Sequence, residues 1–132
     1  MRKFKLTAPE PTESQLHATV AQFLDWALMP PAFYTTFPAG WGVLTKATAG
    51  RLKGSGLKRG MPDLQAFYKG KSVCIELKSH TGRLTPEQQN THELLRAAGV
   101  QVFVCTTLDE VIEALREVGF PLRRTRGASD VA

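Results

Sequence analysis

The sequence predicts a single α/β domain in which helices flank a mixed sheet, and three patterns indicate this. Two apolar runs, residues 64–68 and 73–78, surround a short turn with glycine at position 70, which is typical of an antiparallel hairpin. A helix and another apolar run follow with short connections, which predicts a parallel strand reached by a crossover. An amphipathic helix precedes them all. The expected order is α-β-β-β-α-β-α.

The first half of the chain predicts one helix and one strand. Residues 12–15, Thr-Glu-Ser-Gln, have the spacing of a capping box, and apolar residues then recur at helical intervals up to the proline pair at 30–31. Residues 32–37 are rich in aromatic residues and threonine, which favours a short strand ending at the Pro-Ala-Gly turn at 38–40. Residues 43–53 give a weak signal for a short helix followed by a loop.

The second half predicts two further helices around a strand. Residues 85–88, Thr-Pro-Glu-Gln, combine a capping box with proline at the first helical position. This helix is expected to stop at Gly99, and a strand follows at 100–105. The last helix is capped by threonine and glutamate at its start and spans 107–119.

The composition is that of a globular protein rather than a disordered or membrane chain. Its 132 residues, 42% of them hydrophobic and 22% charged, suffice for one domain, with an expected core at about 12–119 and a basic tail at 120–132. No apolar run reaches the roughly 20 residues of a membrane helix, and no signal peptide is evident. Cys74 and Cys105 lie in apolar runs and are interpreted as reduced core thiols. These features predict a cytoplasmic protein.

The positive charge is concentrated in one glycine-rich stretch. The net charge is +5, and no acidic residue occurs between Asp25 and Asp63. A basic, flexible backbone suits a phosphate chain, although charge alone supports a solvated loop without a partner equally well. The cations of this stretch are Lys46, Arg51, Lys53, Lys58 and Arg59, and the tail adds Arg123, Arg124 and Arg126.

Three polar residues of the predicted hairpin indicate a functional site: Asp63, Glu76 and Lys78. Residues two apart in a strand share a face, so Glu76 and Lys78 project together. A turn at 69–70 places Asp63 opposite Glu76, and a turn at 70–71 places it opposite Lys78. Both registers bring the three side chains to one face, whereas a slip of one residue would move Asp63 to the other face.

Two carboxylates beside a lysine form an oxygen-rich site for a hard cation. Mg²⁺ prefers one or two carboxylates, water and phosphate oxygens, and such an ion promotes phosphodiester hydrolysis. Lys78 is placed to hold the attacking water or to stabilise charge on the phosphate, and the main-chain carbonyl of Leu77 is a further candidate ligand. The three residues support equally a cross-strand salt bridge of Lys78 on an exposed sheet face.

Glu13 extends this candidate site to the first helix. It shares a helical stripe with His17, Val20 and Leu24, and this stripe is expected to pack on the sheet. We therefore expect Glu13 at the interior end of the helix, where it binds the ion directly or through water. The alternative is a carboxylate that only interacts with the helix dipole.

Three blocks of the sequence resemble the signature blocks of the VRR-NUC domain, a branch of the PD-(D/E)XK nuclease superfamily. They are Gly-Met-Pro-Asp-Leu at 60–64, Ile-Glu-Leu-Lys at 75–78 and Gly-Arg-Leu-Thr-Pro-Glu-Gln at 82–88. The PD and ExK pattern alone occurs in many proteins. The full order is much more specific: a helix with Glu13, a basic glycine-rich loop, and then the three blocks in sequence. Met61 stands where the family usually has a smaller aliphatic residue.

The resemblance implies a restriction-endonuclease-like αβββαβ core and a role for each matching residue. It assigns Asp63 and Glu76 to a divalent metal, Lys78 to the nucleophilic water and Glu13 to support of the site. Gln88 matches a family glutamine near the active site, although it completes the cap of its helix equally well. The implied cofactor is Mg²⁺, with Mn²⁺ as a substitute.

Stand-alone domains of this length look like phage or mobile-element proteins, similar to homodimeric resolvases that cut Holliday junctions. We therefore expect an endonuclease acting on branched DNA as a homodimer, in a bacterial cell or a phage host. The basic stretch would follow phosphates, and His80 is a further candidate DNA contact. Two other classes stay open: a non-cutting nucleic-acid-binding module, and a subunit of a larger repair or restriction complex.

The three histidines give no further site. His17, His80 and His92 have no common spacing, so a zinc site is not expected. Each is interpreted as a surface or packing residue, apart from the DNA contact considered for His80.

Overall fold

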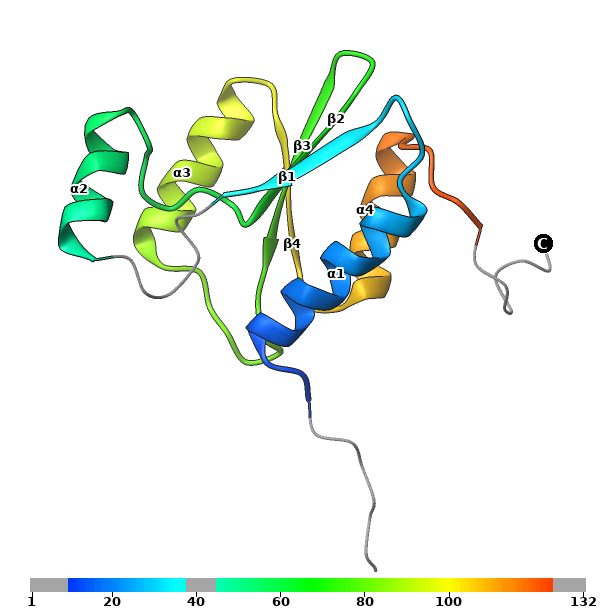
Figure 1. Ribbon diagram of the computed structural model, residues 1–132, viewed down its shortest axis with the longest axis horizontal. Coiled ribbons are helices and arrows are strands. Elements are labelled where there is room, and N and C mark those ends of the chain that lie inside the picture. Colours follow the sequence, from blue (N-terminus) through cyan, green and yellow to red (C-terminus); the bar gives the residue numbers. More distant parts are fainter. Residues whose placement is uncertain (1–9, 38–44, 125–132) are drawn as a thin grey trace, which may run out of the picture.

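The computed structural model describes residues 10–37 and 45–124, which form a mixed α/β fold with a four-stranded sheet (Figure 1). The predicted order of helices and strands is confirmed, and the weak signal near residue 50 corresponds to an additional helix. The elements in chain order are α1 (Glu13–Ala27), β1 (Phe33–Thr36), α2 (Lys46–Gly54), β2 (Leu64–Tyr68), β3 (Lys71–Leu77), α3 (Pro86–Ala97), β4 (Gln101–Cys105) and α4 (Leu108–Val118).

The helix ends follow from local hydrogen bonds that the sequence encodes. At α1, the Thr12 side chain accepts a bond from the Gln15 N–H at 3.1 Å, and the Gln15 side chain accepts one from the Thr12 N–H at 2.8 Å. An equivalent capping box begins α3. At the end of α4, Gly119 has a φ of 90°, a left-handed conformation that glycine adopts without steric cost.

The sheet has the strand order β1-β2-β3-β4, with antiparallel pairs except for the parallel pair β3 and β4. In the β2–β3 hairpin Tyr68 lies opposite Lys71, so the two-residue turn is Lys69 and Gly70, both with positive φ. This turn conformation matches the twist of paired strands. The first of the two predicted registers is therefore confirmed. Extended by one residue beyond the pair of Leu64 and Ile75, it puts Asp63 opposite Glu76.

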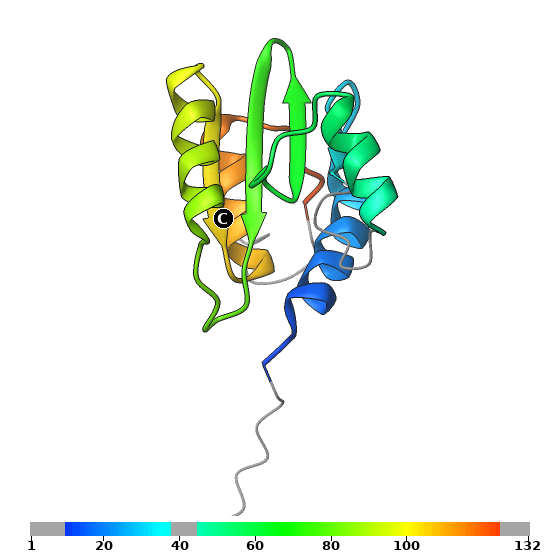
Figure 2. The same cartoon turned by 90° about the vertical axis from the view of Figure 1, so that its left-hand side faces the viewer.

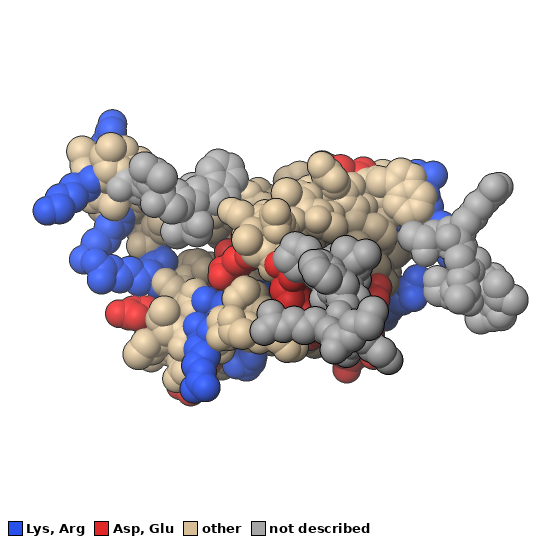
Figure 3. Space-filling view, turned by 90° about the horizontal axis from the view of Figure 1, so that it is seen from below, with Lys and Arg blue, Asp and Glu red and all other residues tan. Residues whose placement is uncertain are grey.

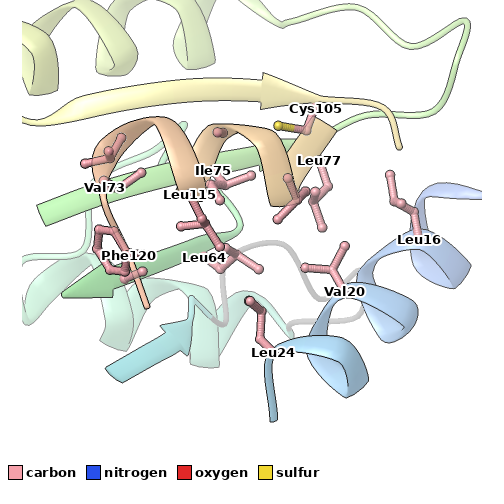
Figure 4. Packing of buried hydrophobic residues seen from close by; sticks show 14 residues of the cluster. Leu16, Val20, Leu24, Leu64, Val73, Ile75, Leu77, Cys105, Leu115 and Phe120 are labelled. Carbon is pink, nitrogen blue, oxygen red and sulfur yellow. The ribbon is translucent and has the colours of Figure 1, made fainter. Parts of the chain in front are cut away.

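Helices α1 and α4 cover one face of the sheet and enclose the hydrophobic core with it (Figure 4). The alternation of β3 places Val73, Ile75 and Leu77 in this core. Burying a leucine or isoleucine side chain stabilises a fold by about 1.5–3 kcal/mol. The core residues labelled in Figure 4 are Leu16, Val20, Leu24, Leu64, Val73, Ile75, Leu77, Cys105, Leu115 and Phe120.

Helix α3 lies on the opposite face, over β3 and β4. Figure 2 shows α3 and α1 on opposite sides of the β2–β3 hairpin. The residues of α3 that are buried are Thr91 and His92, both polar. Over β1 and β2 this face is open to solvent, as the exposure of Phe33 and Phe67 shows; their rings stack on each other. The face that bears Glu76 is therefore covered over β3 and not over the whole sheet.

The packed part of the chain extends beyond the predicted core end at Gly119. Phe120 is buried in the core, and Leu122 forms a bridge to the end of α1. The N–H of Arg123 donates to the Ala27 carbonyl at 2.7 Å, and its guanidinium lies over the Trp26 ring. Arg123 therefore closes the end of α1 instead of belonging to a free basic tail. The predicted turn at 38–40, the start of the 43–53 segment, Arg126 and the last residues of the tail lie outside the described residues.

The two cysteines are free and buried, as the sequence predicts. Burial raises the pKa of Cys74 to about 11 and that of Cys105 to about 12, so both stay protonated at neutral pH. None of the helices that the structure describes has the length and apolar character needed to cross a membrane.

Candidate active site

Asp63 is fixed where β1, β2 and β3 come together. Its carbonyl accepts a hydrogen bond from the Phe37 N–H at 3.0 Å, and its Oδ2 accepts one from the Leu77 N–H at 2.7 Å. The preceding Pro62 is fully buried. The side chain therefore points across to β3 and reaches the neighbour of Glu76, which is the orientation that the sequence predicts.

Gly60 brings this Asp63 loop against the start of α3. Its φ is +79°, and a Cβ at this position would lie 2.4 Å from the carbonyl oxygen of Glu87. The Thr91 hydroxyl also donates a hydrogen bond to the Arg59 carbonyl. A glycine is therefore required at position 60 by close packing as well as by backbone conformation.

Glu76 is the centre of the site and is only 1% exposed. Its Oε1 lies 3.1 Å from Nε2 of His92, and the carboxyl group of Asp63 is close enough to raise its pKa. The alternative of a salt bridge on an exposed sheet face is thereby excluded, because Lys78 is only 8% exposed as well. Glu76 and Lys78 are therefore buried at the end of β3, and Asp63 beside them is half-buried.

The environment strongly disfavours the charged form of Glu76 and raises its pKa to about 9. Burial is the largest cause, followed by the hydrogen bond and the negative charge of Asp63. The Lys78 charge acts in the opposite direction, and Glu13 adds a smaller upward contribution. A proton or a cation between two adjacent carboxyl groups would relieve the repulsion that disfavours ionising both.

Leu77 contributes main chain and core packing at the same point. Its side chain is fully buried among the core residues, and its N–H is the donor to Asp63. The next N–H, of Lys78, donates to the Cys105 carbonyl at 3.0 Å. The end of β3 is therefore held from both neighbouring strands, so that Glu76 and Lys78 have little freedom to move.

Glu13 is exposed, which corrects the expectation that it lies at the interior end of α1. The stripe that packs on the sheet contains Leu16, Val20 and Leu24, while Glu13 belongs to the first turn, which projects beyond the core. Its charge nevertheless acts on Glu76. The position therefore suits an influence through water or through charge.

Gln88 is occupied by its helix cap. Its Oε1 accepts a hydrogen bond from the Thr85 N–H at 2.9 Å, and its N–H donates to the Thr85 hydroxyl at 3.1 Å. The structure thus shows the capping role that the sequence allows. His80 is exposed beyond the end of β3, where its side chain is open to solvent.

His92 is a residue of the site that the sequence interpretation missed. The sequence suggests a surface or packing histidine; the side chain is fully buried, as the packing alternative expects, and it also contacts Glu76, which the sequence did not indicate. Its pKa is lowered, mainly by burial and then by the charges of Arg96 and Lys78, so the imidazole is neutral. The sequence feature that could have indicated His92 is its position one helical turn after Gln88, which places both residues on the same side of the helix.

The predicted phosphate-binding cations lie on and after α2, and all five are exposed. Helix α2 has no buried residue and no acidic residue in its first turn. A hollow of about 390 Å³ lies between α2 and the following loop. Figure 3 shows Lys and Arg gathered at the α2 end and acidic side chains near the centre of the same view. Four of the predicted cations line the hollow: Lys46, Lys53, Lys58 and Arg59.

Residues 10–37 and 45–124 contain no group of three or more His, Cys, Asp or Glu side chains that would hold a metal ion alone. The donor set at the end of β3 therefore consists of two carboxylates. This set does not suit a structural zinc ion, which is held by four protein ligands, but it suits Mg²⁺, which keeps water and substrate oxygens as ligands.

Comparison with known proteins agrees with this arrangement. The model of the VRR-NUC domain family matches residues 8–108, which include every residue of the site described above. The fold is similar to that of a solved structure described as a "VRR_NUC domain protein", with a TM-score of 0.61 and 21% sequence identity. That similarity covers 82% of this chain and 88% of the other. The comparison with curated proteins gave no match.

Proposed function

This chain belongs to the VRR-NUC domain family, a nuclease-type family, and we propose that it is a divalent-metal-dependent DNA endonuclease that hydrolyses phosphodiester bonds. The observation that supports this best is that the half-buried Asp63 lies beside the buried Glu76 and Lys78 at the end of β3. A buried carboxyl pair is unfavourable unless a cation or a proton lies between its members.

The carboxyl pair fits the metal that the family implies. Asp63 and Glu76 would bind Mg²⁺ or Mn²⁺ directly, with the Leu77 carbonyl as a candidate third ligand and Glu13 acting through water. The bound ion would polarise the scissile phosphate and favour ionisation of water. The two carboxylates give the site its charge and its position, since both are fastened to the β2–β3 hairpin.

Lys78 would act on the reacting groups directly. The residue is nearly buried and its charge acts on Glu76, and low exposure to water strengthens its interaction with an anion. It would orient the attacking water by a hydrogen bond and stabilise the negative charge that develops on the phosphate. Gln88, held in its cap, would support the start of α3 near these groups.

The basic side chains around α2 would bind the DNA backbone. Cations that contact phosphates give affinity without sequence preference, so recognition would depend on the shape of the DNA. This favours a structure-selective enzyme acting on branched DNA, such as a Holliday junction. A homodimer would supply the two sites needed to cut two strands symmetrically. The proposed DNA contacts are Lys46, Arg51, Lys53, Lys58, Arg59 and His80.

The proposal is tested with labelled branched and linear DNAs incubated with Mg²⁺, Mn²⁺ or EDTA. We expect cleavage in either metal, preference for branched substrates and none in EDTA. Asp63→Ala, Glu76→Ala and Lys78→Ala should be inactive while binding DNA as the wild type does. The matched control is Glu117→Ala, which removes an exposed acid in the last turn of α4. Full cleavage by Asp63→Ala or Glu76→Ala would remove this site from consideration.

The competing function is a nucleic-acid-binding module that does not cut. The basic α2 region would serve such a module, but two converging carboxylates repel DNA and give it no advantage. DNA binding without cleavage in either metal, unchanged by Asp63→Ala, would favour this alternative.

A further inference from the structure

Helix α3 contacts the sheet through an unusual pair of buried residues. Thr91 and His92 are its buried side chains, whereas Leu94 is 62% exposed. Thr91 bonds to the Arg59 carbonyl and thereby holds the loop before Asp63. His92 is the large side chain that α3 directs into the sheet, and it is directed at the carboxyl group of Glu76. An amphipathic helix usually docks through apolar residues.

Glu76 is held between two partners that come from different elements. Its Oε1 lies 3.1 Å from His92 Nε2, and the carboxyl group of Asp63 lies close enough to influence it. Neither Glu76 nor His92 is more than 1% exposed, so water cannot replace either contact. The orientation of the Glu76 carboxyl therefore depends on the imidazole on one side and on Asp63 on the other.

The imidazole is retained at a cost to folding. Within the residues that the structure describes, one buried side-chain polar atom has no hydrogen-bond partner, and it is Nδ1 of His92. A buried polar atom without a partner is destabilising, and a leucine at this position would avoid the penalty. The helix could then dock as well or better, so packing alone does not explain a histidine here.

We propose that His92 is a positioning residue for Glu76: its Nε2–H holds Oε1 so that the carboxylate presents its remaining lone pairs, with Asp63, to a divalent cation. This inference rests on the proposed metal-dependent function. A hydrogen bond from Nε2 to Oε1 fixes the orientation of the carboxylate and leaves its other lone pairs free for the ion. Partners of metal-binding side chains typically change metal affinity roughly 10- to 100-fold when removed.

Three substitutions separate the hydrogen bond from packing. His92→Leu keeps an apolar side chain of similar size and removes the donor. His92→Gln places an amide nitrogen at the reach of Nε2, whereas His92→Asn places one only at the reach of Nδ1. Glu93→Gln is the control, because it changes an exposed side chain of the same helix.

The main measurement is Mn²⁺ affinity by calorimetric titration of the full chain without DNA. We expect His92→Leu and His92→Asn to bind Mn²⁺ roughly 10- to 100-fold more weakly, and His92→Gln to stay within about threefold of the wild type. Glu93→Gln should leave both the melting temperature and the Mn²⁺ affinity unchanged. The Mg²⁺ concentration that gives half-maximal cleavage should shift in the same order, while DNA binding in EDTA stays constant.

The proposal is overturned if His92→Leu binds Mn²⁺ as the wild type does, or if His92→Gln and His92→Asn are equally impaired. The comparison of the two amides decides the question even if His92→Leu does not fold. A wild type that binds Mn²⁺ but cuts no DNA would contradict the proposed function and leave the His92 comparison intact. A wild type that cuts normally while the His92 variants keep full Mn²⁺ affinity would contradict only the positioning role.

Discussion

Glu76→Gln tests whether the buried carboxyl group destabilises the protein without metal. The folded-state pKa of Glu76 is about 9, compared with an ordinary value of 4.5. The folded state therefore favours the protonated form. Protonated Glu76 therefore contributes to the stability of the folded state; this contribution is complete below a pH of 4.5 and is lost as the pH rises towards about 9. Glutamine has no proton to lose and should remove this dependence.

The expected magnitude follows from the release of one proton. Stability should fall by at most about 1.4 kcal/mol per pH unit, or about 2.7 kcal/mol between a pH of about 6 and about 8. In EDTA, Glu76→Gln should lack this fall and be more stable than the wild type at the higher pH. Saturating Mg²⁺, at about 100 times its dissociation constant, should restore about 2.7 kcal/mol to the wild type and little to the variant.

The assay is urea unfolding in EDTA and in Mg²⁺ at several pH values, with Glu117→Gln as an exposed acid control. The control should follow the wild type in both conditions. If wild type and Glu76→Gln lose stability in parallel as the pH rises, the carboxyl group is not held protonated. If Mg²⁺ stabilises both equally, Glu76 does not bind the ion.

Three further predictions concern the surroundings of the site. Gly60→Ala and Gly70→Ala both force a positive φ on alanine, which costs about 1 kcal/mol, but only the Cβ at position 60 meets backbone atoms. Gly60→Ala should therefore lose at least about 2 kcal/mol more of its unfolding free energy in urea than Gly70→Ala, and should also lose cleavage. Equal losses would show that the loop does not pack on α3. Replacing Lys46, Lys53, Lys58 and Arg59 by alanine should weaken duplex binding. The slope of log K against log salt concentration should fall by about 0.9 for each phosphate that the protein no longer neutralises, whereas Arg116→Ala on α4 should leave it unchanged. An unchanged slope for the first variant in a binding titration would place the DNA elsewhere. Cys74 and Cys105 should react with a thiol reagent only after unfolding, and reaction in native buffer would contradict their burial and raised pKa values.

Short-range interactions encoded in the sequence set the local structure and the face of the acidic residues. Both capping boxes lie within four consecutive residues, so the helix starts at Thr12 and Thr85 follow from short-range hydrogen bonds. The two-residue turn at Lys69 and Gly70 sets the hairpin register, and the period of two along a strand puts Asp63 on the face of Glu76. These interactions depend on neighbours in the chain, which is why a pattern predicts them.

The surroundings of the acids depend on how the elements pack in three dimensions. Whether β3 presents Glu76 to solvent or to a helix depends on where α3 packs, and α3 begins nine residues after β3 ends. The exposure of Glu13 depends in the same way on how far the first turn of α1 projects past the core. A hydrophobic pattern shows which side of a helix faces inward, but it does not show where along the sheet the helix ends.

His92 shows most clearly what the sequence left open. A buried histidine and a surface histidine have the same local pattern, because α3 has buried polar residues where an apolar stripe is expected. Its contact with Glu76 joins residues 16 positions apart and exists only once the helix lies on the sheet. Chain-local forces placed the two carboxylates on one face, and only packing between elements determined that Glu76 is buried and contacts an imidazole.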